Sequence, residues 1–86
     1  MNFDTRMTEL VAVGASVAAN CQSCVEYHVG KAAEQGVDPQ EIAQAVDVGR
    51  MVRRGAAAKV DKTVERLRGE LASVPEAHDG CGCPAR

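Results

Sequence analysis

Three residues in one short segment have the types and the spacing for thiol chemistry. Cys21, Cys24 and His28 follow Asn20, a residue suited to cap a helix. On a helix with about 3.6 residues per turn, positions three, four and seven apart share one face. Two sulfurs three positions apart can close into a disulfide, and a nearby imidazole can take a thiol proton. The segment therefore predicts a redox or metal site at the start of a helix.

The helix start also affects which sulfur reacts. Unpaired amide donors and the positive end of the helix dipole favour a thiolate, and Cys21 in the first turn gains most from them. Cys24 lies one turn deeper, on the side of His28, which could serve as its base. Dipole reasoning alone therefore favours Cys21 as the more acidic thiol, and the attacking sulfur stays open at this point.

Composition restricts the class of protein. The 86 residues fit one domain, and the apolar content is mostly Ala and Val, with one Phe, one Tyr and no Trp. A core this thin predicts self-association. The net charge is −2 with no basic block, so we expect no nucleic-acid partner.

Location follows from what the sequence lacks. No stretch is long enough to span a bilayer, and residues 1–6 do not resemble a signal peptide. We therefore expect no membrane partner and a cytoplasmic location. In that compartment four cysteines are more often catalytic, redox-cycling or metal-binding than structural.

Helical periodicity predicts an all-α domain of about four helices. Apolar residues recur with helical spacing over residues 5–19, and a second helix is expected over 21–35, ending at Gly36. Asp38 as a cap, followed by Pro39, indicates the start of a third helix, with Glu41 three residues after the cap.

The rest of the chain divides into a last helix and a tail. The third helix is expected to end at Gly55. A fourth over residues 56–73 carries an apolar stripe, and its charged face is expected to be solvated. We predict a helical domain over residues 1–74 and a flexible tail over 75–86. The stripe consists of Val60, Val64, Leu67 and Leu71.

Residues 9–28 resemble the core motif of the alkylhydroperoxidase AhpD-like, carboxymuconolactone decarboxylase superfamily. The resemblance continues through residues 36–45 and 52–57 and covers about residues 5–70. It implies an AhpD-like all-helical subunit that forms trimers or hexamers by helix packing. It also implies a thiol-dependent peroxidase or disulfide oxidoreductase that takes a peroxide or a disulfide and is restored by a dithiol reductant protein.

The resemblance also assigns roles to residues. It implies that Cys24 attacks peroxide and that Cys21 resolves the sulfenic acid as a disulfide. His28 and Glu9 match the family's proton relay. Ser23 stands where well-studied peroxidases carry a second histidine. Thiol-disulfide exchange is therefore nearly as well supported as peroxide reduction. The dithiol argues for redox chemistry over lactone decarboxylation, with no cofactor beyond the redox-active disulfide.

Alternatives remain for each group. His28 could be an ordinary hydrogen-bonded histidine, and Glu9 a surface acid. The tail residues Cys81 and Cys83 could relay electrons to the core pair, or join His78 as ligands for zinc, copper(I) or another thiophilic metal. The alternative function is therefore a binding protein for a thiophilic metal or metalloid that uses core and tail cysteines.

Overall fold

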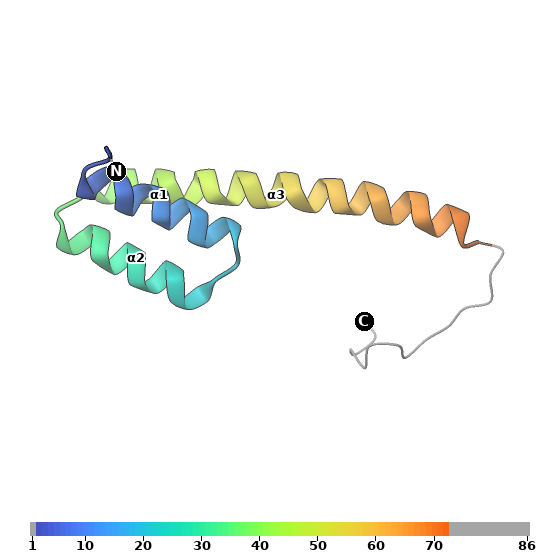
Figure 1. Cartoon of the computed structure of the whole chain (residues 1–86), viewed down its shortest axis with the longest axis horizontal. Coiled ribbons are helices and arrows are strands. Elements are labelled where there is room, and N and C mark those ends of the chain that lie inside the picture. Colours follow the sequence, from blue (N-terminus) through green and yellow to red (C-terminus); the bar gives the residue numbers. More distant parts are fainter. Residues whose placement is uncertain (1, 73–86) are drawn as a thin grey trace.

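The computed structural model describes residues 2–72, which form three α-helices (Figure 1). They are α1 (Thr5–Ala18), α2 (Gln22–Glu34) and α3 (Pro39–Glu70). α1 and α3 run in the same direction and α2 runs in the opposite one, and α1 and α2 lie alongside the first half of α3. α1 makes the main contact with both of the other helices. The predicted all-α fold is confirmed. The predicted tail, with His78, Cys81 and Cys83, lies outside the described residues.

The expected third and fourth helices form one continuous helix. The predicted end at Gly55 is wrong, because α3 continues for 32 residues from Pro39 to Glu70. A glycine inside a helix costs only about 1 kcal/mol relative to alanine. The residues on both sides of Gly55 favour a helix, so their combined preference outweighs that cost.

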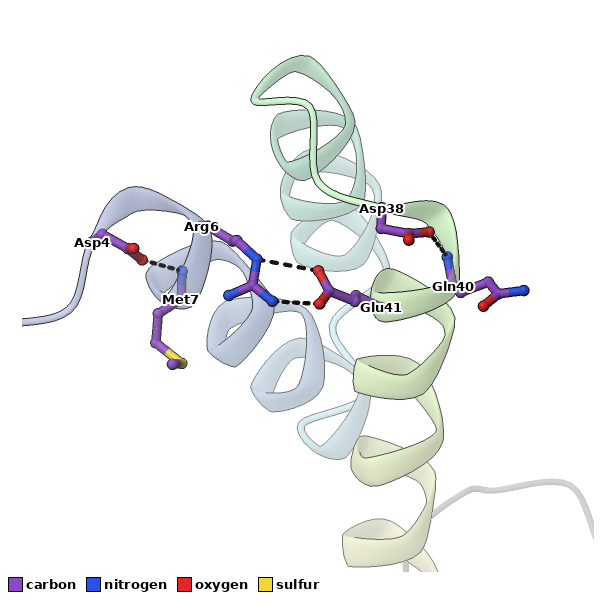
Figure 2. Close-up of polar contacts among 6 residues, drawn as sticks. All are labelled: Asp4, Arg6, Met7, Asp38, Gln40 and Glu41. Atoms are coloured by element: carbon purple, nitrogen blue, oxygen red, sulfur yellow. Dashed lines mark hydrogen bonds and ion pairs between the residues drawn. The ribbon is translucent and has the colours of Figure 1, made fainter.

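Two short polar contacts fix where α1 and α3 begin (Figure 2). Asp38 caps α3 as predicted, its Oδ1 accepting from the Gln40 amide at 2.8 Å. Asp4 caps α1 in the same way. Between these caps, Arg6 forms an ion pair with Glu41, and this hydrogen-bonded carboxylate raises the pKa of Arg6 above its usual value. The pair joins the first turns of α1 and α3.

The turn between α1 and α2 differs from the expectation that Asn20 caps α2. Asn20 has φ 58°, the left-handed conformation that asparagine tolerates better than most residues. Its amide donates to Val17 O and the Cys21 amide donates to Ser16 O, the pair of bonds that closes a Schellman motif. Asn20 therefore ends α1, and Cys21 is the residue that caps α2.

The turn between α2 and α3 repeats this motif with glycine. Gly36 has φ 79°, and the amides of Gly36 and Val37 bond back to the last turn of α2. Val37 is then buried against Ala32 and Ile42. This small cluster, with Val13 and Val17, forms the buried core of the described residues.

Close backbone contact between α1 and α3 depends on two glycines. A Cβ on Gly49 would lie 2.5 Å from the Gly14 carbonyl oxygen and 2.7 Å from Val17 Cβ. A Cβ on Gly14 would lie 3.2 Å from the Ala45 carbonyl oxygen. The absence of side chains at both positions lets the helices approach closely enough to bury Val17.

The second half of α3 extends past α1 and α2 (Figure 1). We call residues 54–70 the overhang, because every described residue from 54 onward is exposed. Its apolar side chains share one stripe but no helix of the described chain covers them. No described helix combines the length and apolarity that a bilayer crossing requires. The exposed stripe, with the adjoining Leu71, consists of Val60, Val64, Leu67 and Leu71.

Candidate thiol site at the start of α2

The two core cysteines form a disulfide at the first turn of α2. Cys21 and Cys24 are joined with their Cα atoms 5.2 Å apart. Cys21 Sγ also accepts a hydrogen bond from the Cys24 amide at 3.3 Å, so the sulfur itself caps the helix. The Ser23 hydroxyl lies 3.8 Å from the same sulfur. Both residues are partly exposed.

Glu9 and His28 meet across the α1 and α2 interface. His28 Nδ1 lies 2.8 Å from Glu9 Oε1, and the two side chains are 29% and 13% exposed. A carboxylate can only accept, so this pair places the proton on Nδ1 and leaves Nε2 as the nitrogen that can exchange a proton. The structure therefore brings together two residues that lie 19 positions apart in the sequence.

Helix geometry places the His28 imidazole on the same side of α2 as Cys24. His28 follows Cys24 by four positions on α2, so the two side chains share a face of that helix. Tyr27 packs edge-on against the His28 ring, with centroids 5.0 Å apart, yet is itself 59% exposed. The Glu9 bond and the Tyr27 ring thus hold the imidazole from two sides.

A pocket of about 410 Å³ opens beside Cys21. The turn supplies Asn20, Cys21 and Gln22 to its wall, and α3 supplies two arginines. Arg53 Nη1 donates to Asn20 Oδ1 at 3.0 Å and to the Val17 carbonyl at 3.4 Å, so it is fixed against the turn. The remaining lining residues are Val17, Val25, Val46 and Arg50.

The sequence-based expectations did not single out the two arginines. They lie far along the chain from the thiols, and only the parallel packing of α3 on α1 brings them to the turn. A signal was present, since Val46, Arg50 and Arg53 have the four-and-three spacing of one helix face. A helix face that combines Val46 with two arginines indicates a surface where the packed interior meets an open, charged site.

The four predicted site residues form two contacts. Cys21 and Cys24 are bonded to each other, and Glu9 is bonded to His28. Their catalytic roles stay predictions. Within residues 2–72, no three His, Cys, Asp or Glu side chains gather closely enough to hold a metal ion. The metal ligands suggested for the tail, Cys81, Cys83 and His78, lie outside the described residues.

The fold and the site define a small helical protein with a disulfide-forming cysteine pair at a helix start. The chain belongs to the carboxymuconolactone decarboxylase family, whose model matches residues 2–65. This range includes the disulfide, the Glu9 and His28 pair and both pocket arginines. No curated protein and no solved structure matches the chain.

Proposed function

We propose that this protein is a thiol-dependent oxidoreductase that cycles Cys21 and Cys24 between dithiol and disulfide. Its oxidant is a peroxide or a disulfide. The observation that carries the proposal is the closed Cys21–Cys24 pair on α2, one turn before a histidine held by Glu9. A dithiol at a helix start favours thiolate, and an imidazole with a carboxylate partner suits proton transfer at the same place.

In the peroxide reaction, His28 Nε2 takes the proton of Cys24 and the thiolate attacks the terminal peroxide oxygen. The O–O bond breaks, Cys24 becomes a sulfenic acid, and the leaving alkoxide or hydroxide takes a proton from His28. The Cys21 thiolate then attacks Cys24 Sγ, releases water after protonation, and closes the disulfide. With a disulfide as oxidant, the Cys24 thiolate attacks one substrate sulfur and releases the other as a thiol. The Cys21 thiolate then attacks Cys24 Sγ of this mixed disulfide, closes the Cys21–Cys24 bond and releases the second substrate thiol.

Two reductant thiols restore the protein dithiol, and they come either both from one dithiol reductant protein or one each from two small thiol molecules. We keep the cytoplasm as the proposed location, because a reducing compartment supplies such partners. The proposal needs no cofactor beyond the redox-active disulfide itself.

We also propose that a second copy of the chain covers the overhang. Val60, Val64, Leu67 and Leu71 follow a four, three, four spacing, the repeat that packs two helices along a shared seam. They are 42% to 59% exposed in the single chain. The described core is small, so covering this stripe adds burial that the chain lacks alone. A trimer or hexamer remains the expected assembly.

The decisive test follows the oxidation of individual sulfurs. Reduced protein receives limiting peroxide, and mass spectrometry of peptides maps the products. We expect a Cys21–Cys24 disulfide in the wild type, a trapped sulfenic acid on Cys24 in Cys21→Ser, and loss of peroxide-dependent oxidation in Cys24→Ser. The matched control is Ser23→Ala, which changes the neighbouring hydroxyl and leaves both sulfurs in place. A reduced protein that shows no turnover with peroxide or disulfide, and holds stoichiometric metal, would identify the metal-binding alternative instead.

The Glu9 and His28 pair has a separate test. Glu9→Gln keeps the size of the side chain and removes its charge, so we expect Cys24 oxidation to slow by roughly 10-fold, less than the roughly 100-fold or more that losing the base itself would cost. Glu26→Gln is the matched control, since Glu26 is an exposed glutamate on α2, the helix that carries His28. An unchanged rate of Cys24 oxidation in Glu9→Gln would remove Glu9 from the proposal.

A further inference from the structure

Only one of the two disulfide residues lines the pocket at the turn between α1 and α2. Cys21 lines this pocket, whereas Cys24 is not among its lining residues. A molecule seated there therefore meets the disulfide at Cys21 Sγ. Attack at that atom releases the Cys24 thiolate, on the helix face that Cys24 shares with His28.

The charged residues that line the pocket are all positive. Among the described residues that line it, two are arginines and none is acidic. Arg53 binds two neutral oxygens, so its contacts hold the guanidinium in place and leave its charge uncompensated. Arg50 pairs only loosely with Asp47, at 3.9 Å on an exposed surface where such pairs contribute little. The pocket therefore favours an anion beside Cys21.

We propose that the pocket binds a carboxylate-bearing, low-molecular-weight thiol as the reductant of the disulfide, with Arg50 and Arg53 as its specificity-determining residues. The proposal rests on the proposed redox function. Guanidinium groups recognise carboxylates through paired N–H donors. A volume of about 410 Å³ suits a small molecule, and the valine wall accepts its methylene groups.

The electrons and atoms balance over two exchanges. The thiolate of the first reductant molecule attacks Cys21 Sγ, a mixed disulfide forms, the Cys21–Cys24 bond breaks, and Cys24 leaves as a thiolate. A second reductant thiolate attacks the reductant sulfur of the mixed disulfide and releases Cys21 as a thiolate. The protein gains two electrons, and the reductant leaves as its own symmetrical disulfide.

The test compares thiols that differ in charge. Oxidised full-length protein is reduced with 3-mercaptopropionate, 2-mercaptoethanol or cysteamine, and each rate is divided by that thiol's rate with a neutral small disulfide. This division removes differences in thiolate fraction and nucleophilicity. Two arginines near a carboxylate, with solvent screening, should give the anionic thiol an advantage of roughly 10-fold at low salt. The advantage should shrink in 1 M salt, where charges are screened beyond about 3 Å.

Variants assign the preference to the pocket. Arg50→Gln should reduce the advantage to roughly 3-fold, because one of two charges is lost. Arg54→Gln is the matched control, since Arg54 is the same residue type on the same helix and lies outside the lining. Arg50→Lys keeps the charge and removes the planar fork, so it should retain most of the electrostatic advantage. Arg53→Gln is less informative, because Arg53 also holds the Asn20 turn.

The results separate this inference from the proposed function. If dithiothreitol and all three thiols leave the disulfide closed, both proposals fail. If every thiol opens it with the same normalised rate, the redox function stands and the anionic pocket is overturned. The last comparison uses a peptide with one cysteine and acidic neighbours as the reductant. Acceleration of that peptide without acceleration of 3-mercaptopropionate would overturn the choice of a small free thiol.

Discussion

The two halves of α3 are chemically similar in sequence but differ in what surrounds them. In the first half, Gly49 sits against the backbone of α1 and Ile42 is buried. In the overhang, nothing lies within 4 Å of a Cβ built on Gly55, and Leu67 is 42% exposed. One continuous helix therefore carries a glycine needed for packing and a glycine with open space around it. Tertiary contact, and not local sequence, determines what each residue contributes.

The comparison also separates two kinds of apolar stripe. In the first half of α3 the stripe consists of Ile42, Val46 and Gly49; Gly49 contacts α1, and Val46 lines the pocket beside the disulfide. The stripe on the overhang has the same type of spacing but faces no described helix. The first positions the thiol site within one chain, and the second is available for another copy.

The largest effect is expected from Gly49→Ala. The added Cβ would meet the Gly14 carbonyl oxygen at 2.5 Å, and backbone cannot move aside as a flexible side chain can. We expect a loss of about 3 kcal/mol in the free energy of unfolding, the upper part of the usual range for overpacking. Chemical denaturation measures it. A variant as stable as the wild type would show that α1 and α3 pack less closely than described.

Leu67→Gln probes the overhang. The substitution places a polar group in the exposed stripe, so the first half of α3 should keep its structure while self-association weakens by about 2 kcal/mol. Light scattering over a range of concentrations measures the mass, and circular dichroism at high dilution checks that the helices remain. Lys62→Gln, on the charged side of the overhang, is the control. Wild-type protein that remains a monomer at high concentration would contradict the second-copy proposal.

Gly55→Ala should act in the opposite direction to Gly49→Ala. Its Cβ meets nothing within 4 Å, and alanine favours a helix over glycine by about 1 kcal/mol. We expect a higher melting temperature and slower amide exchange in the neighbouring turns of α3. Destabilisation would instead indicate that a second copy packs directly onto Gly55.

Arg6→Gln should have the smallest effect. The Arg6 and Glu41 pair joins the starts of α1 and α3, but its side chains are 48% and 36% exposed. Exposed pairs of this kind are screened by water and salt. We expect the melting temperature to change little, and the small difference to disappear at high salt. A large loss that persists in salt would mean that this pair determines the alignment of the two helices.

Local patterns predicted most of the fold. The Asp38 and Pro39 start, the Gly36 stop and the helical spacing of apolar residues each reflect backbone chemistry within a few residues. The end at Gly55 was predicted wrongly because a glycine's cost is small against a long helix. Asn20 was assigned to the wrong helix, because asparagine favours both a helix start and the left-handed residue after a helix end.

The site was predictable where its chemistry is local. The Cys21 and Cys24 spacing is enough to expect a disulfide. Glu9 was reached through the family resemblance, since residues 19 positions apart on separate helices have no spacing rule. Arg50 and Arg53 approach the disulfide only through the packing of α3. Contacts between distant helices depend on the whole fold, so local patterns could not supply them.

Because Cys21 Sγ accepts a hydrogen bond from the Cys24 amide, one sulfur of the disulfide is also part of the backbone hydrogen bonding of α2. A thiolate is a stronger acceptor than a disulfide sulfur, so reduction to a Cys21 thiolate is expected to strengthen this bond and to order the first turn of α2 further. A partner that contacts this turn would then meet a differently ordered helix start in each redox state.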